Sequence, residues 1–112
     1  MATFGGVVST SEVPIHAVVS PTPGATVNLN AASGNLFKWT AGEAETINVT
    51  AGQQAGRIIT LMIANDAVAR TITFGTGIVS LGVLIGTGLK TSMSVFQSDG
   101  TNFYELSRTL GL

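Results

Sequence analysis

Polar and apolar residues alternate at every second position in three short segments of this chain. Thr26–Leu29, Thr46–Val49 and Thr71–Phe74 each place a Thr or Asn beside an aliphatic or aromatic residue. This period of two is typical of a strand with one face in a core and the other in solvent. The segments begin 20 and 25 residues apart. Because these spacings are unequal, we interpret the segments as one common strand type and not as a solenoid repeat.

Short apolar runs bounded by turn residues predict five further strands. They are Leu36–Thr40, Arg57–Ala64, Ile78–Ile85, Ser92–Gln97 and Asn102–Arg108. The Arg57–Ala64 run is apolar on both faces and should be central, although a helix over Leu61–Arg70 is a less favoured alternative. Asp99-Gly100 accepts positive φ and lies between two apolar runs, which predicts a hairpin at Ser98–Thr101. The pattern predicts an all-β fold, a β-sandwich or jelly-roll-like single domain.

Residues 1–24 have a different composition from the rest. They contain all three prolines and the pair Gly5-Gly6. Proline removes a backbone donor and restricts the residue before it, so a regular internal strand is not expected here. The segment is nevertheless apolar, through Phe4, Val7, Val8, Val13, Ile15, Val18 and Val19. We expect an extended N-terminal arm over residues 1–24 that lies on an apolar partner, followed by a β-sandwich domain over residues 25–112. The alternative is a disordered start that ends in an edge strand around Ile15–Val19.

Charge is scarce in this chain. Only 10% of the 112 residues are charged, against about 25% in an average domain, and the mean hydropathy is +0.45. A folded monomer of this mass exposes roughly 5,800 Å², so each charge serves about 500 Å² of surface. Either neutral polar residues coat that surface, with 15 Thr and 9 Ser at hand, or copies and partners cover it. We expect both.

Composition and spacing argue against several functional classes. A formal net charge of −1 does not suit a protein that must neutralise phosphates, so no nucleic-acid partner is expected. There is no Cys, and the single His16 has no cluster of ligands around it, so no metal site is expected. Glu43 and Glu45 are better interpreted as part of a solvated loop than as a catalytic pair or a calcium site. We expect no enzyme, no catalytic residues and no cofactor.

Thr71–Leu89 holds no charged residue and has a length that suits a membrane helix. Its glycines and hydroxyl residues gather at turn-like points, Gly75-Thr76-Gly77 and Gly86-Thr87-Gly88. We therefore interpret it as strands, with Ile78–Ile85 as one buried strand between two loops, and expect no membrane partner.

Four segments resemble, in the same order, a broad group of β-domains from tailed-phage virions. They are Gly34-Asn35-Leu36-Phe37-Lys38-Trp39, Thr46–Val49, Arg70–Gly75 and Ser98–Glu105. The resemblance covers roughly residues 26–108 and is most specific at Ser98–Glu105, where Asp-Gly-Thr precedes an aromatic strand. Such domains occur in tail fibres and in small capsid-associated proteins. The resemblance implies a homotrimeric sandwich or jelly roll with a mechanical task.

Together these observations favour a capsid decoration (cement) protein of a phage. The expected partners are the major capsid protein and copies of the chain itself, and the expected location is the capsid surface, with the host cytoplasm before assembly. The expected capsid contacts lie in the arm, at Phe4, Val7, Val8, Val13, Ile15, Val18 and Val19. The alternative is a tail-fibre or tail-tip module that binds a host receptor, with Trp39, Phe103 and Tyr104 as stacking residues; we expect these aromatics to fill the core instead.

Overall fold

The computed structural model describes residues 17–112, which form ten strands and no helix. More than half of these residues lie in strands, so the all-β prediction is confirmed. The strands are β2 (Val18–Val19), β3 (Thr26–Asn30), β4 (Leu36–Ala41), β5 (Glu45–Ala51), β6 (Ile58–Asn65), β7 (Thr71–Phe74), β8 (Ile78–Val79), β9 (Leu84–Ile85), β10 (Thr91–Ser98) and β11 (Phe103–Thr109).

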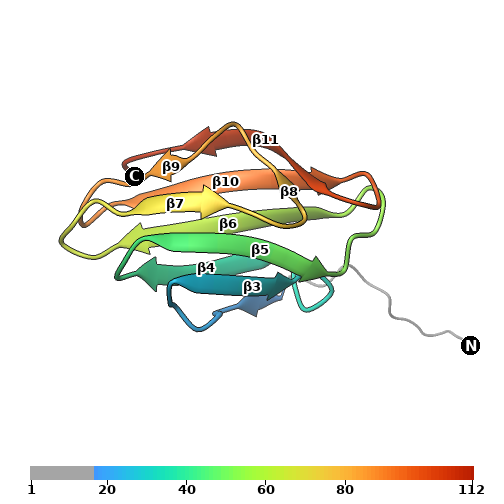
Figure 1. Cartoon of the computed structure of the whole chain (residues 1–112), viewed down its shortest axis with the longest axis horizontal. Helices are drawn as coiled ribbons and strands as arrows, with labels where there is room; N and C mark the ends of the chain where they lie inside the picture. Colours follow the sequence, from blue (N-terminus) through green and yellow to red (C-terminus); the bar gives the residue numbers. More distant parts are fainter. Residues whose placement is uncertain (1–16) are drawn as a thin grey trace, which may run out of the picture.

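The strands form two sheets that face each other across one core (Figure 1). The six-stranded sheet has the order β2-β4-β6-β10-β11-β8, and the four-stranded sheet has the order β3-β5-β7-β9. From β2 to β7 the chain alternates between the sheets, and each strand from β2 to β5 pairs in parallel with the strand two places later. This is the course of a flattened β-solenoid, and it differs from the antiparallel pairing by which jelly rolls are built.

The three alternating segments of the sequence are parallel neighbours, so the interpretation of them as unrelated to a solenoid course is wrong. Thr26–Leu29 pairs residue by residue with Thr46–Val49. The third segment is offset by two residues, since Thr73 pairs with Thr46. Connections of unequal length run through the other sheet between these strands, and loops absorb such differences without changing the stacking. Equal spacing of the segments along the sequence was therefore too strict a criterion for recognising a solenoid course.

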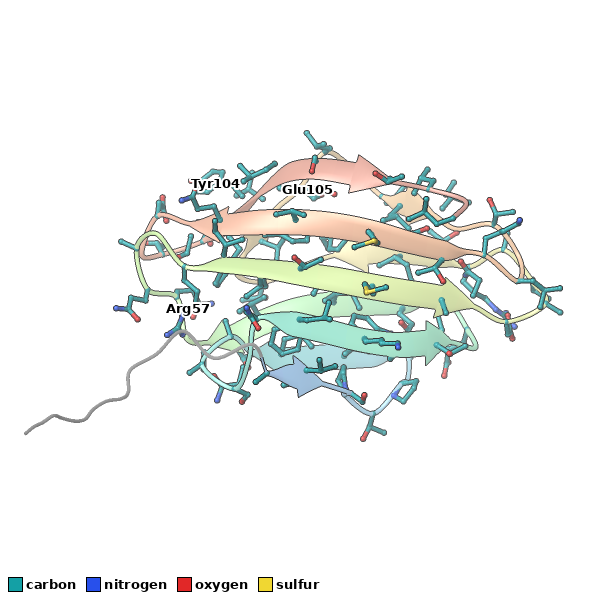
Figure 2. The ribbon with its side chains drawn as sticks, turned by 180° about the vertical axis from the view of Figure 1, so that it is seen from behind. Arg57, Tyr104 and Glu105 are labelled. Atoms are coloured by element: carbon teal, nitrogen blue, oxygen red, sulfur yellow. The ribbon has the colours of Figure 1, made fainter. Side chains whose placement is uncertain are left out.

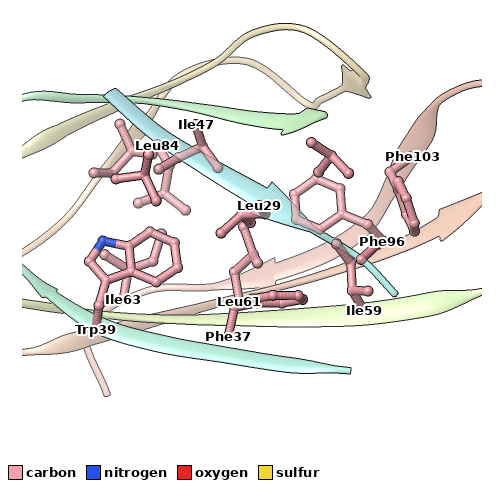
Figure 3. Packing of buried hydrophobic residues seen from close by; sticks show 14 of the residues in the cluster. Leu29, Phe37, Trp39, Ile47, Ile59, Leu61, Ile63, Leu84, Phe96 and Phe103 are labelled. Carbon is pink, nitrogen blue, oxygen red and sulfur yellow. The ribbon is translucent and has the colours of Figure 1, made fainter. Parts of the chain in front are cut away.

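Alternate side chains of the long strands point inward, and the apolar ones among them form one layer (Figure 3). Phe37, Leu61 and Phe96 come from three adjacent strands of the large sheet, while Leu29 and Ile47 come from the small one. The ring of Phe96 meets Phe74 of the small sheet edge-on, with centroids 5.5 Å apart. The strand β6 lies third of six, so the prediction of a central strand is confirmed and the helical alternative over Leu61–Arg70 is wrong.

The hairpin predicted at Ser98–Thr101 is confirmed, since β10 and β11 pair antiparallel on either side of it. Gly100 has φ of +102°, which a residue with a Cβ rarely adopts. The Asp99 carboxylate accepts hydrogen bonds from the backbone N–H groups of Thr101 and Asn102, each at 2.9 Å. These local contacts specify the turn, so its sequence was sufficient to predict it.

Ile78–Ile85 is not one buried strand, and that prediction is wrong. Ile78–Val79 pairs with β11 of the large sheet, whereas Leu84–Ile85 pairs with β7 of the small sheet. Gly82, with φ of +116°, turns the chain between them. Only Leu84 of this segment is buried in the core.

Ala17–Gly24, the described end of the predicted arm, lies against the domain. Val18 and Val19 pair with Leu36 and Phe37 at the edge of the large sheet. The side chain of Val19 packs against the core, and that of Val18 is 59% exposed. The expected contact residues Phe4, Val7, Val8, Val13 and Ile15, and His16, lie outside the described residues.

The core layer predicts a sharp contrast between two neighbours on β6. Leu61 is fully buried, so Leu61→Ala should lower the free energy of unfolding by about 2–5 kcal/mol. Met62 points to the opposite side of the sheet and is half-buried, so Met62→Ala should cost clearly less. Urea unfolding of both variants in dilute solution measures this. Equal losses would mean that the assignment of the two faces is wrong.

Candidate interaction surface

The two sheets turn very different outer faces to the surroundings. The outward residues of the small sheet carry hydroxyl or amide groups, apart from Ile85 at its edge. We call this the polar face: Thr26, Asn28, Asn30, Thr46, Asn48, Thr50, Thr71 and Thr73. Parallel stacking places Asn48 beside Asn28, and the Asn48 amide donates to the Asn28 carbonyl oxygen at 3.1 Å. This face is uncharged but offers many hydrogen-bonding groups to water.

The large sheet presents aliphatic and thioether side chains mixed with neutral polar ones on its outer side, which faces the viewer in Figure 2. We call this the apolar face: Val18, Leu36, Lys38, Thr40, Ile58, Thr60, Met62, Ala64, Thr91, Met93, Val95, Gln97, Tyr104, Ser107 and Thr109. The strand register aligns them in rows, one of which runs through Lys38, Met62 and Met93. Lys38 is the one charged residue of the set.

The charged residues of the described chain avoid both outer faces, apart from Lys38. Arg57, Lys90 and Asp99 lie in loops, and Glu43 is exposed in the turn before β5. Asp66 and Arg70 pair with each other in the loop after β6, with oxygen and nitrogen 2.7 Å apart. Neutral polar residues coat one sheet, and the other sheet bears rows of apolar residues mixed with Thr, Ser and Gln. Contiguous apolar patches of this kind mark interaction sites.

A groove of about 540 Å³ opens on the apolar face beside the edge of β4. β2 pairs with only Leu36 and Phe37, so no described strand pairs with the second half of β4 on this side. Pro21 lacks an N–H, which prevents β2 from continuing along β4. Val18, Pro21, Pro23, Lys38, Met62 and Ala64 are among the residues that line the groove.

Glu45 fastens the wall of this groove, and the expectation of a solvated loop at this residue is wrong. Its side chain is buried, and its carboxylate accepts hydrogen bonds from the Trp39 indole N–H at 2.8 Å and from the Gly24 N–H at 3.3 Å. Burial raises the pKa of Glu45, although both hydrogen bonds oppose the shift. Glu43 remains exposed, as expected. Sequence reasoning missed this contact because Trp39 and Glu45 are brought together only by the turn between two sheets.

At the opposite edge of the large sheet, a second buried carboxylate holds the loop between β8 and β9. Glu105 accepts a hydrogen bond from the Leu81 N–H at 2.8 Å and pairs with Arg108 at 2.6 Å. Arg108 also donates to the carbonyl oxygens of Gly82 and Val83, at 2.8 and 2.9 Å. The loop therefore has a fixed shape although it buries little apolar surface.

The pKa of Glu105 is set by opposing influences. Burial is the largest and would raise it, but the Arg108 guanidinium and the Leu81 N–H stabilise the carboxylate, and the net pKa is lowered. The guanidinium carbon also lies 5.9 Å from the centre of the Phe74 ring, so the pair bridges the two sheets at this edge.

The structure places the three aromatic residues considered as receptor contacts in different environments. Trp39 and Phe103 are buried in the core, which confirms the expectation for these two. Tyr104 is 41% exposed on the apolar face, so the expectation that it fills the core is wrong. Thr71–Leu89 forms β7, β8 and β9, and within residues 17–112 no helix has the length and apolarity to cross a membrane. No group of three His, Cys, Asp or Glu that could hold a metal ion occurs in the same range.

Comparison with other proteins finds no matching family model, no matching curated protein and no matching solved structure.

The raised pKa of Glu45 predicts a pH dependence of stability. Between its ordinary value of 4.5 and the raised value, the folded state binds more protons than the unfolded state, so stability falls as pH rises through this window. Glu45→Gln removes the titration. Urea unfolding from acid to neutral pH should show the wild type losing stability relative to this variant as pH increases. A difference between the two that does not change with pH would contradict the assignment.

Removal of the Arg108 guanidinium should be costly, because it leaves Glu105 buried without a counter-charge. We expect Arg108→Met to lower the free energy of unfolding by about 2–4 kcal/mol, since Arg108 itself remains partly exposed. The double variant Glu105→Gln/Arg108→Met, measured by the same denaturant titration, should recover part of the loss. A double variant that is no more stable than the single one would refute a role for the unpaired charge.

Proposed function

We propose that this chain is a non-enzymatic structural subunit of a tailed-phage virion: a homotrimeric capsid decoration protein that binds and stabilises the head. Residues 1–24 attach it to the major capsid protein, and the domain of residues 25–112 packs against sibling copies. The subunit resides on the capsid surface after synthesis in the host cytoplasm. We interpret the two sheets as a sandwich whose first strands follow a solenoid course.

The apolar face carries this proposal. It extends across β4, β6, β10 and β11 with a single charge, whereas interface cores are depleted in charge and enriched in Met and aromatic residues. A monomer that works in isolation gains nothing from such a surface. A subunit that shares load with neighbours over many weak contacts requires it.

The position of the arm supports attachment through the N-terminal residues. The chain reaches the domain at Val18, on the rim of the apolar face and beside the groove. The segment before it contributes Phe4, Val7, Val8, Val13 and Ile15, five apolar residues in a stretch without Lys or Arg. An extended segment of this kind binds by adding main-chain hydrogen bonds to a sheet edge and side chains to shallow pockets.

The exposed Tyr104 favours the second candidate, a tail-fibre or tail-tip module that binds a host receptor. Its ring combines an apolar body with a polar tip, as receptor-binding surfaces use. Copy number separates the candidates. A decoration protein occurs in purified virions at on the order of hundreds of copies, and a tail module at a handful.

Binding to undecorated heads tests the role of the arm. In one variant, Phe4, Val7, Val8, Val13 and Ile15 are all replaced by Ser, which keeps the chain length unchanged. We expect it to fold like the wild type, because the described core lies within residues 17–112, and to lose co-sedimentation with heads. The matched control Thr73→Ser, on the polar face, should bind normally. Head binding by the five-residue variant would rule out attachment through the arm.

A further inference from the structure

One sheet edge, formed by β3, is built unlike the other three. The two sheets have four edge strands, and three of them, β2, β8 and β9, have two residues each. β3 has five residues, none of which is charged or proline. Very short strands, charges and prolines are among the means by which proteins keep a sheet edge from pairing. β3 has none of these three, and within residues 17–112 no strand pairs with its outer side.

Half of the backbone groups of β3 point away from the sheet. The residues that flank the strand both bond to β5: the Ala25 carbonyl accepts from the Thr46 N–H, and the Ala31 N–H donates to the Ala51 carbonyl, each at 2.9 Å. Successive residues of a strand direct their N–H groups to opposite sides. Residues at odd positions in β3 therefore face β5, and the N–H groups at positions 26 and 28 face outward without a partner strand.

A hollow of about 370 Å³ opens beside this edge. Among the residues that line it are Leu29 and Phe37 of the core, Val19 of β2, and the polar Asn30 and Ser33. A solenoid exposes the end of its core unless a terminal segment caps it. On the far side, β9, β10 and β11 continue the two sheets beyond β6 and β7. The hollow marks the end of the core that the described strands do not close.

The described chain begins next to this end of the core. The Ala17 carbonyl accepts hydrogen bonds from the N–H groups of Asn35 and Leu36, at 3.2 and 3.4 Å, and Val18 then pairs in parallel with Leu36. Ala17 therefore lies beside the connection that leads from β3 to β4. A chain traced upstream along that connection arrives at the outer side of β3.

The length of the connection indicates which residues arrive there. Five residues, 31–35, separate β3 from β4. A connection of the same length before β2 spans residues 13–17, and the five residues before it are Val8–Glu12. Pro14 then falls in the connection, where it removes no hydrogen bond from a sheet. The longest stretch of residues 1–16 without Gly or Pro, residues 7–13, contains Val8–Glu12, and Val and Thr favour strands.

We infer that Val8–Glu12 forms a fifth strand of the small sheet in the same chain, parallel to β3, and closes this end of the core. Its backbone bonds the outward groups of Thr26 and Asn28, and its hydroxyl side chains suit a hollow with both polar and apolar walls. The inference goes beyond the proposed function and does not depend on it. Of the apolar arm residues, Val8 alone lies in this strand, so the others remain available to a partner.

Hydrogen exchange of individual amides, followed by NMR on the purified full chain, tests the added strand. In the wild type, the amides of Thr26 and Asn28 should exchange at least about tenfold more slowly than in an unstructured peptide. The variant Ser9→Pro/Thr10→Pro should abolish this protection. Because successive N–H groups point to opposite sides, one of the two prolines removes a group that faces β3 in either register.

Two controls accompany this variant. The amides of Val27 and Leu29, which face β5, should stay slow throughout and show that the domain is folded. The matched variant Ala2→Pro/Thr3→Pro, upstream in the same arm, should leave the exchange of Thr26 and Asn28 unchanged. If the first variant does not fold, nuclear Overhauser contacts between the Thr26 or Asn28 amide and residues 8–12 of the wild type provide the same test.

Fast exchange of Thr26 and Asn28 in the wild type would overturn the inference, and so would protection that survives Ser9→Pro/Thr10→Pro. Protection that disappears on dilution would mean that a second copy supplies the strand. Protection that requires undecorated heads would mean that a capsid protein supplies it, and either result would overturn the assignment to the same chain. A chain that is protected in isolation but does not bind heads would refute the proposed function alone.

Discussion

One apolar layer between two sheets holds this domain together, and every long strand must turn alternate side chains into it. Most inward residues are therefore apolar, with buried polar exceptions such as Glu45, Ser94 and Glu105, and the outward residues have more chemical freedom. The small sheet uses that freedom for Thr and Asn, which parallel stacking aligns into hydrogen-bonded pairs such as Asn28 and Asn48. The large sheet uses it for Leu36, Met62, Met93 and other apolar residues. The domain has one face suited to water and one suited to a partner.

The scarcity of charge follows from this division. Apart from Lys38, the charges in the described chain either lie in loops at the ends of the sheets or hold structure in place. Glu45 ties Gly24 and Trp39 together at the groove, and Glu105 with Arg108 fixes the loop between β8 and β9 at the opposite edge. The buried carboxylates thus fix local structure at the two edges of the large sheet. An ionised group on the outer face of the large sheet would lose its hydration if a partner covered that face. New contacts rarely return the free energy that this desolvation costs.

Local patterns predicted the strands well and the path between them poorly. Period-two alternation identified Thr26–Leu29 and its two counterparts, and Asp99-Gly100 identified the hairpin, because residues a few positions apart determine both. The alternation between sheets depends on contacts across 20 or more residues, such as Thr26 with Thr46, that no local window contains. Glu45 and Ile78–Ile85 were misjudged for a different reason: the chain crosses from one sheet to the other between Trp39 and Glu45 and again around Gly82, and the local residue pattern does not signal a change of sheet. Composition pointed to a covered surface but did not locate it.

Oxidation of Met62 and Met93 tests most directly whether the apolar face is covered. Both side chains lie on that face, in one row of the strand register, and both are half-buried in the isolated subunit. Peroxide converts accessible methionine to the sulfoxide, which peptide mass spectrometry quantifies residue by residue. The account predicts rapid oxidation of both in the dissociated chain at high dilution and strong protection in the assembled state. Equal oxidation rates in the two states would show that the face stays open to solvent and would contradict the account.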